Sequence, residues 1–145
     1  MKKVRALIDT NVVVKAAIDI SKGSMLPERK VIELVIKNEI KPVITITLLE
    51  EYCRIAKELV DKDFAGWLRN LIVTGMKPVF ISDEICEELK PKFEGKLPKE
   101  DLIHFLTCIA ANANYLITNN REFLMKAKNP IFKCLTPREF LDERM

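Results

Sequence analysis

Short apolar runs alternate with stretches of helical periodicity along the whole chain, and this alternation constrains the fold more than any other feature of the sequence. Because helices rather than tight hairpin turns separate the runs, the strands must be joined by crossover connections, which place them parallel. Strands are expected over Val4–Ile8, Val43–Ile46, Pro78–Ile81, Tyr115–Thr118 and Ile131–Leu135. The sequence therefore predicts an α/β fold, a three-layer sandwich with helices on both faces of a mainly parallel, about five-stranded sheet.

Several helices are expected to begin at recognisable signals. Thr47 and Glu50 have the spacing of a capping box, in which a hydroxyl and a carboxylate satisfy free amides, so a helix is expected from Thr47 to about Val60. Thr136 and Glu139 repeat this spacing around Pro137 and predict a short last helix. The other helices are expected over residues 12–20, from Pro27 onward, and over residues 63–73, 83–89 and 102–113.

Composition limits the class of protein. The chain has 145 residues, of which 48% are hydrophobic and 31% charged, and it has no internal repeat or linker, so residues 1–145 are expected to form a single domain. A formal net charge of +3 neither requires nor excludes a polyanionic partner. No stretch approaches the roughly 18–20 apolar residues that cross a bilayer, and four cysteines without a C-x-x-C pair suit reduced thiols. We therefore expect a cytoplasmic protein without a membrane partner.

Acidic and polar residues follow or border the predicted strand ends, at the edge where open α/β sheets place their working sites. They are Asp9 at the end of the first strand, Glu51 after the second, Asp101 before the fourth, and the segment Thr118–Glu122 after the fourth. Each alone also fits helix capping or turn chemistry. Glu51 is favoured over Glu50 as the site acid because Glu50 would complete the capping box.

Together these carboxylates predict a cation site. Carboxylates held a few ångströms apart repel one another unless they are protonated or bound to a metal, and oxygen ligands suit Mg²⁺ or Mn²⁺. No Ser or Cys nucleophile has an independent base: Asp101, His104 and Cys108 share one helix face, where side chains do not converge on a reacting atom. Hydrolysis by a metal-activated water is the expected chemistry.

The order and spacing of these segments resemble the PIN-domain nucleases, specifically the single-domain prokaryotic type that includes ribonuclease toxins of toxin–antitoxin pairs. The resemblance rests on Ile8–Asn11, Thr45–Glu51, Asp101–Cys108, Ala113–Phe123 and Leu135–Leu141, and so spans nearly the whole chain. It implies a PIN-like fold and a Mg²⁺- or Mn²⁺-dependent endoribonuclease that hydrolyses RNA. It also implies an antitoxin protein as a candidate partner and a homodimer.

The resemblance also implies roles for individual residues. It assigns Asp9, Glu51, Asp101 and Asn120 to the catalytic site, Asp9, Glu51, Asp101 and Glu122 to the metal, and Thr10 or Asn11 together with Thr118 to polar support. Asn120 stands where the family often has Asp, which removes one negative charge. This departure keeps open a second interpretation, a catalytically weakened module that binds RNA or a protein partner.

Another enzyme class also begins with an acid at the end of the first strand. In phosphoaspartate enzymes of the haloacid-dehalogenase type that acid becomes phosphorylated, which would be the role of Asp9. The sequence matches this class poorly, because Asn11 stands where those enzymes have their second Asp.

A Lys-rich loop precedes Asp101. Its lysines, opposed only by Glu94, are Lys90, Lys92, Lys96 and Lys99. Such a loop either binds a nucleic-acid backbone, with Phe93 stacking on a base, or is simply solvated. The residues expected to contact the substrate are Asn11, Thr118, Lys99 and His104, with an ordinary helix histidine as the alternative for His104. Trp67 is expected in the core or at a dimer surface rather than under a base.

Overall fold

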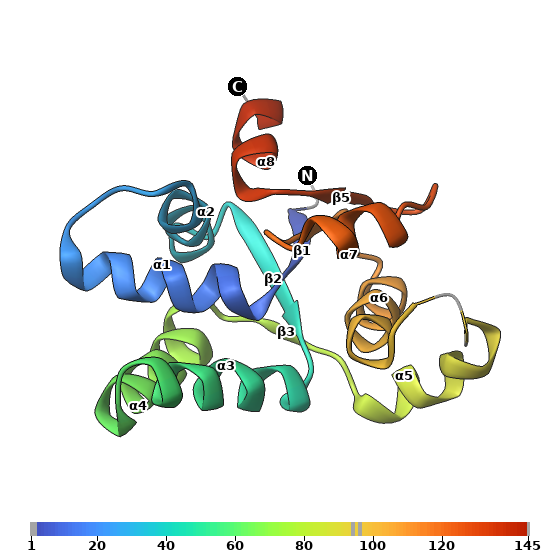
Figure 1. Cartoon of the computed structure of the whole chain (residues 1–145), viewed down its shortest axis with the longest axis horizontal. Coiled ribbons are helices and arrows are strands. Elements are labelled where there is room, and N and C mark those ends of the chain that lie inside the picture. The colour runs from blue at the N-terminus through green and yellow to red at the C-terminus, as the bar shows by residue number, and fades with distance from the viewer. Residues whose placement is uncertain (1–2, 94, 96, 145) are drawn as a thin grey trace.

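The computed structural model describes residues 3–93, 95 and 97–144 and has the predicted α/β architecture. The strands are β1 (Val4–Ile8), β2 (Ile40–Ile44), β3 (Val79–Phe80), β4 (Tyr115–Ile117) and β5 (Lys133–Leu135). They form one sheet in the order β3-β2-β1-β4-β5, and each neighbouring pair is parallel. Figure 1 shows helices on both sides of this sheet, which confirms the predicted three-layer sandwich. Glu94 and Lys96 of the Lys-rich loop lie outside the described residues.

Helices make up most of the connections between consecutive strands, and one further helix follows the last strand. They are α1 (Thr10–Lys22), α2 (Pro27–Ile36), α3 (Ile46–Leu59), α4 (Lys62–Asn70), α5 (Asp83–Leu89), α6 (Lys99–Ala111), α7 (Arg121–Lys126) and α8 (Pro137–Arg144). In Figure 1, α1 and α2 lie on one side of the sheet, and α5 and α6 lie on the other. From β1 the chain adds β2 and then β3 on one side. It then returns past β1 and adds β4 and β5 on the other side. Right-handed crossovers in opposite directions place their helices on opposite faces, which produces the sandwich.

The central strand β1 is covered on both faces. Ala6, Leu7 and Ile8 are at most 2% exposed, which explains why this strand is a continuous apolar run rather than an alternating one. The core extends to Leu106 on α6 and Phe140 on α8, both fully buried. No helix among the described residues has both the length and the apolar composition needed to cross a membrane.

The second strand and the helix after it start earlier than predicted. The strand covers Ile40–Ile44 rather than Val43–Ile46, and Pro42 lies within it, opposite Ala6. β3 pairs only with Val43 and Ile44, so β2 has no partner on that side at Pro42, and a residue without an N–H is tolerated there.

Thr45, not Thr47, caps α3, so the predicted capping box of Thr47 and Glu50 is wrong. Thr45 has an extended backbone at the end of β2, and its Oγ1 accepts a hydrogen bond from the Leu48 N–H at 3.0 Å. Thr47 lies exposed inside the first helical turn. The cap follows from where the strand ends, because the chain enters the helix directly.

Other differences concern helix boundaries. α1 begins at Thr10 rather than at residue 12. α4 ends at Asn70, and a π-helical turn, Leu71–Gly75, follows it. Turn chemistry was one interpretation of the segment after β4, and in the structure this segment continues into the short helix α7. The capping box before α8 is confirmed: Thr136 N–H donates to Glu139 Oε1 at 2.9 Å, and Glu139 N–H donates to Thr136 Oγ1 at 3.1 Å.

The shifted cap of α3 gives a stability test. Thr45→Ala removes the cap hydrogen bond from a fully buried side chain and should lower the free energy of unfolding by about 1–2 kcal/mol. Urea unfolding followed by circular dichroism measures this loss. Thr47→Ala is the matched control and should change stability by less than about 0.5 kcal/mol. A larger loss in Thr47→Ala than in Thr45→Ala would contradict the cap assignment.

Candidate metal centre at the carboxyl edge of the sheet

Asp9 and Thr118 meet where β1 and β4 lie side by side, at the point where the sheet reverses its direction of growth. The Asp9 N–H donates to the Ile117 carbonyl at 2.9 Å, so strand pairing continues up to the carboxylate. Thr118 is fully buried, and its Oγ1 donates a hydrogen bond to Asp9 Oδ2 at 2.6 Å. Ligands of open α/β sheets bind beyond the carboxyl ends of the strands at such a reversal.

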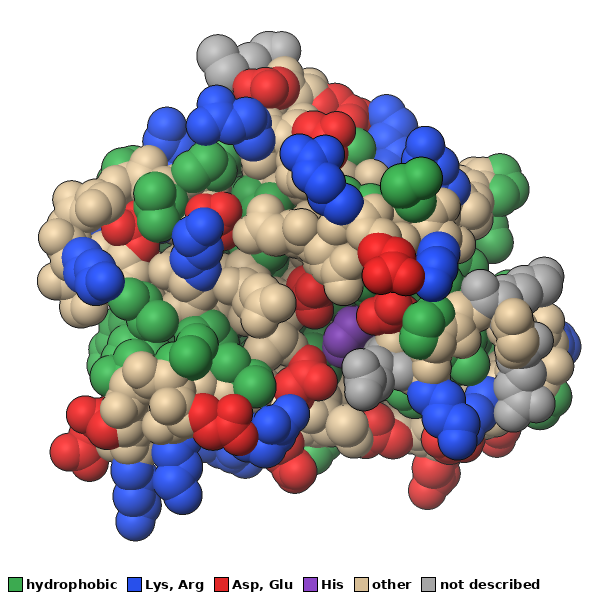
Figure 2. All heavy atoms as spheres, viewed as in Figure 1, with side chains coloured by type: hydrophobic (Ala, Val, Ile, Leu, Met, Phe, Trp, Pro, Cys, Tyr) green, Lys and Arg blue, Asp and Glu red, His purple; other side chains and the backbone are tan. Residues whose placement is uncertain are grey.

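Three side chains from different parts of the chain converge at this edge. Asp9 caps α1, Glu51 lies on α3 and His104 lies on α6, and one ligand atom from each lies within 4.8 Å of the others. His104 Nε2 is 3.6 Å from Asp9 Oδ1 and 3.8 Å from Glu51 Oε2. Figure 2 shows acidic side chains around the histidine on this face of the molecule. We call Asp9, Glu51 and His104 the acid–histidine cluster.

Thr10 orients both carboxylates of the cluster. Its backbone N–H donates to Asp9 Oδ1 at 2.9 Å, and its hydroxyl donates to Glu51 Oε2. With Thr118 on the other oxygen, both oxygens of Asp9 accept a hydrogen bond. The helix-cap role and the site role of Asp9 are therefore compatible, because the cap hydrogen bond fixes the carboxylate that faces His104.

Tyr52 anchors α3 to the end of β1, directly behind the cluster. Its hydroxyl donates a hydrogen bond to the Ile8 carbonyl, and the side chain is buried. Burial, followed by the negative charges of Asp9 and Glu51, raises the pKa of Tyr52 well above its ordinary value. Tyr52 therefore stays protonated and keeps donating this hydrogen bond, which holds Glu51 at the strand end.

The chemistry of the cluster fits a bound cation. The side chains of Asp9, Glu51 and His104 are 14%, 34% and 10% exposed, so water shields the two carboxylates from each other only in part. Among the described residues, His104 Nδ1 is buried and has no hydrogen-bond partner. The other ring nitrogen, Nε2, faces both carboxylates. The cluster could therefore hold a metal ion through two oxygens and one nitrogen.

Three other residues expected at the site lie outside the acid–histidine cluster. Asp101 lies in the first turn of α6, one turn before His104, and is half-buried. Asn120 caps α7, where its Oδ1 accepts from the Phe123 N–H at 3.1 Å. Glu122 is exposed and forms an ion pair with Lys126 at 2.7 Å. The hydrogen bond to Glu122 and the charge of Glu122, with a smaller effect of Asp101, raise the pKa of Lys126.

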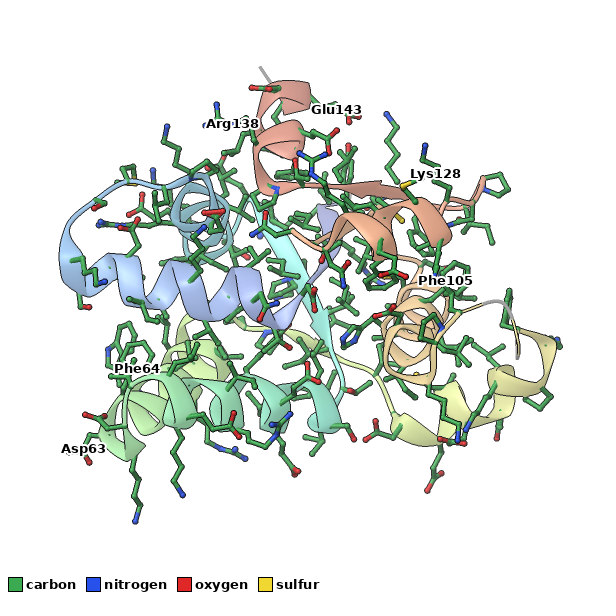
Figure 3. The ribbon with its side chains drawn as sticks, in the orientation of Figure 1. Asp63, Phe64, Phe105, Lys128, Arg138 and Glu143 are labelled. Carbon is green, nitrogen blue, oxygen red and sulfur yellow. The ribbon has the colours of Figure 1, made fainter. Side chains whose placement is uncertain are left out.

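The residues expected to contact the substrate lie in different settings. Asn11 and Lys99 are exposed at the starts of α1 and α6, whereas Thr118 lies buried behind Asp9. The Phe93 ring packs against Phe105 at 5.4 Å between ring centroids, and Figure 3 marks the position of Phe105 on α6. Thr118 thus supports the carboxylate, and the exposed residues are the ones open to a ligand.

Cys108 is fully buried, so it cannot act as a nucleophile with His104 and Asp101. Burial raises the pKa of its thiol well above the ordinary value. All four cysteines are free thiols. Cys134 is half-buried, and burial raises its pKa to about 11. Thiolate chemistry is therefore disfavoured at both positions.

One buried carboxylate near this edge was not predicted from the sequence. Glu28 lies in the first turn of α2 with its side chain 7% exposed. Its Oε1 lies 3.8 Å from Lys15 Nζ, and its Oε2 accepts a hydrogen bond from Asn119 Nδ2 at 3.5 Å. Glu28 thus connects α1 and α2 to the loop after β4. An acid in the first turn of a helix looks like an ordinary favourable charge in sequence, which hides this contact.

Comparisons with known proteins identify relatives at the level of family and fold. The sequence profile of the PIN domain matches residues 5–122. No curated protein sequence gives a significant match. The chain resembles a solved structure described as VapBC2 from Rickettsia felis bound to a DNA fragment from their promoter, with 22% identity and a TM-score of 0.61. The similarity covers 90% of this chain and 97% of that chain.

The hydrogen bond behind Asp9 gives a test of the cluster. Thr118→Val removes the donor to Asp9 Oδ2 and should weaken Mn²⁺ binding by about 10–100-fold, as the loss of a hydrogen bond to a metal ligand does. The electron paramagnetic resonance signal of free Mn²⁺ measures the affinity.

Thr107→Val is the matched control, because Thr107 is also buried but bonds Ile103 on α6, away from the cluster. It should leave Mn²⁺ affinity unchanged. Equal affinity in the native protein and a folded Thr118→Val variant would contradict the role of Thr118, and circular dichroism checks the folding of both variants.

Proposed function

The chain belongs to the PIN-domain family, and we propose that it is a Mg²⁺- or Mn²⁺-dependent endoribonuclease that hydrolyses RNA phosphodiesters with a metal-activated water. The observation that supports this proposal is the convergence of Asp9, Glu51 and His104 at the sheet reversal. Like-charged groups held together there by Thr10, Thr118 and Tyr52 suit a cation better than a neutral ligand.

Each residue of the proposed site has a distinct task. Asp9 and Glu51 would hold the metal through carboxylate oxygens, and His104 would add a ring nitrogen as the third ligand. Asp101 lies one turn before His104 on α6 and is proposed as a further acidic residue of the site. When bound, the ion supplies a water of lowered pKa and positive charge beside the phosphodiester. Thr10 and Thr118 keep the Asp9 carboxylate in one orientation while substrate binds.

Exposed polar groups near the cluster provide the proposed contacts to RNA. Lys99 in the first turn of α6 and Asn11 in the first turn of α1 are exposed, and we assign them to contacts with phosphate oxygens of the substrate. Asn120 and Glu122 in the segment after β4 are the proposed remaining site residues. Glu122 is exposed, and its ion pair with Lys126 lies at the surface.

A toxin role would add a protein partner. The similar Rickettsia felis structure is a VapBC2 assembly, and we extend this to the proposal that the chain binds an antitoxin and forms a homodimer. A cavity of about 520 Å³ runs along α1, with Val14, Ile18, Leu26 and Leu59 among its lining. Such an apolar cavity next to Asn11 suits a hydrophobic segment of a partner that would also cover the cluster.

One observation favours a second candidate function, a catalytically weakened module that binds RNA or a partner. The carbonyl oxygen of Asn120 is occupied by the N-cap hydrogen bond of α7, and its side chain lacks the negative charge of an Asp. The two functions differ in one property, because only the enzyme cleaves RNA.

Cleavage of RNA tests the proposed function. Purified protein with Mg²⁺ or Mn²⁺ should cleave single-stranded or structured RNA, and EDTA should abolish cleavage. Asp9→Asn and Asp101→Asn should lower the rate roughly 100-fold or more, the loss expected when one electrostatic group of an active site is removed. Gel analysis of labelled RNA measures the rates.

Asp142→Asn is the control, because Asp142 is an exposed carboxylate on α8. This variant should cleave RNA at the native rate. Identical purification of all variants excludes contaminating nuclease. Absence of metal-dependent cleavage by the folded native protein, together with measurable RNA binding, would reject the enzyme in favour of the binding module.

A further inference from the structure

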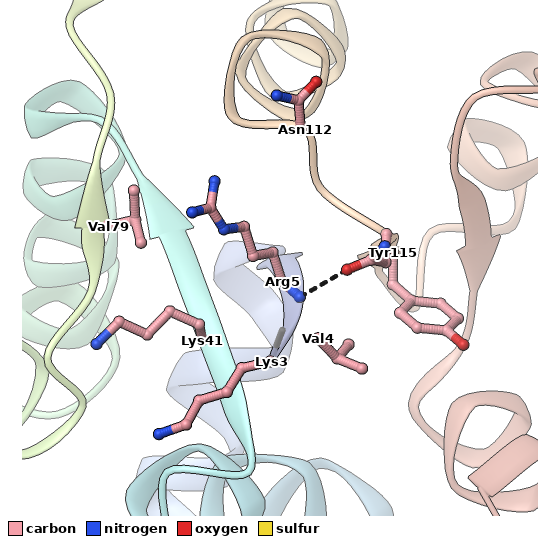
Figure 4. Close-up of a pocket in the computed structure, with 8 residues that line it drawn as sticks. Lys3, Val4, Arg5, Lys41, Val79, Asn112 and Tyr115 are labelled. Carbon is pink, nitrogen blue, oxygen red and sulfur yellow. Dashed lines mark hydrogen bonds between the residues drawn. The ribbon is translucent and has the colours of Figure 1, made fainter. Parts of the chain in front are cut away.

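A basic cavity lies at the amino edge of the sheet, at the opposite ends of the strands from the acid–histidine cluster. It has a volume of about 750 Å³, and its lining includes Lys3, Arg5, Lys41, Asn112, Asn114 and Tyr115. Figure 4 shows these residues around the space between β2 and Tyr115, contributed by β1, by β2 and by the chain between α6 and β4. No residue predicted from the sequence as a site residue lines this cavity.

The cavity concentrates positive charge that the protein does not neutralise. Lys3, Arg5 and Lys41 all line it, and none of the described residues in its lining is acidic. Within the described part of the chain, none of these three side chains forms an ion pair. Cations gathered in a concave surface with low-dielectric walls focus a positive potential and attract anions.

Hydrogen bonds fix two polar groups of the cavity, Arg5 and Asn114, before any ligand binds. Arg5 Nη1 donates to the Ala111 carbonyl at 2.9 Å, which holds the guanidinium beside the end of α6. Asn114 Oδ1 accepts from the Arg5 N–H at 2.9 Å, the dashed line in Figure 4. With its oxygen occupied, the Asn114 amide presents its N–H groups as donors. The remaining Arg5 donors and the two lysines leave a site composed mainly of hydrogen-bond donors.

We propose that this cavity binds a small phosphorylated ligand with at least two phosphate groups, of the size of a nucleoside diphosphate. Three cations match the charge of a diphosphate, and a volume of about 750 Å³ falls within the range of small-molecule sites. The Asn112 and Asn114 amides offer contacts to a sugar or base, whereas the Tyr115 hydroxyl already donates to Glu143 Oε1 at 3.4 Å. This site is separate from the proposed nuclease centre and does not depend on it.

The position of the cavity favours a small ligand over RNA. Arg5 and Asp9 are four residues apart on one extended strand, about 13 Å, but buried core fills the space between them. Helices cover both faces of the sheet, so an RNA strand at the acid–histidine cluster can reach the cavity only by passing around the molecule. A compact ligand can contact Lys3, Arg5 and Lys41 together without extending around the molecule to the other edge of the sheet.

Isothermal titration calorimetry of the native protein tests the proposal. At about 0.15 M salt, ADP and inorganic pyrophosphate should bind with micromolar affinity, and AMP and orthophosphate should bind at least about tenfold more weakly. The double variant Lys3→Gln/Lys41→Gln should weaken ADP binding about tenfold or more. The guanidinium is left in place because Arg5 also bonds the end of α6.

The control removes the same charge elsewhere. Lys57→Gln/Lys62→Gln changes two exposed lysines on α3 and α4 that do not line the cavity, and it should bind ADP like the native protein. An equal loss in this control, or no binding of ADP and pyrophosphate by the native protein, would overturn the proposal. Binding of a short RNA through Lys3 and Lys41 without binding of ADP would also overturn it in favour of a nucleic-acid surface.

Failure of this proposal is distinguishable from failure of the nuclease. The Asp9→Asn variant should bind ADP with native affinity, because Asp9 lies at the other edge of the sheet. Loss of ADP binding in Asp9→Asn would contradict a separate site.

Discussion

The Asp9 side chain both caps α1 and faces His104, and the surrounding structure must allow both roles at once. Its carboxylate lies mostly shielded from water at the end of the central strand, where an ionised group requires hydrogen-bond donors. Thr10 and Thr118 supply one donor to each oxygen, and Thr118 can do so only because β4 pairs with β1. The strand order, the start of α1 and the loop after β4 all contribute to this one carboxylate.

The two edges of the sheet differ in charge. At the carboxyl edge, Asp9 and Glu51 face His104, and at the amino edge Lys3, Arg5 and Lys41 surround a cavity. A parallel sheet permits this separation because all its strands end at the same edge and begin at the other. The two edges therefore suit ligands of opposite charge, a cation at one edge and an anion at the other.

Sequence patterns predicted the fold because burial of the sheet is a property of whole segments. β1 coincides with the predicted Val4–Ile8, since a strand covered on both faces is apolar at each inner position. Local signals were less reliable where two residues shared the same chemistry. Thr45 and Thr47 are both suitable caps, and only the end of β2 decides between them.

Which side chains meet at the acid–histidine cluster likewise depends on contacts between segments that lie far apart in the sequence. Asp9 and Glu51 were predictable because each follows a strand, but Asp101 and His104 lie one turn apart on α6. The rotation of α6 places His104 against the carboxylates, and this rotation is set by packing against β1 and α5 rather than by the sequence of α6 alone. Contacts of Glu28 with Lys15 and Asn119 arise from three separate segments and were not predictable from local pattern.

Anomalous scattering from crystals soaked in Mn²⁺ tests whether the acid–histidine cluster is a metal centre. We expect one strong anomalous peak within roughly 2.0–2.3 Å of ligand atoms of Asp9, Glu51 and His104, with Thr118 still bonded to Asp9. A fully soaked crystal without a peak at the cluster, or with Mn²⁺ bound only elsewhere, would contradict it.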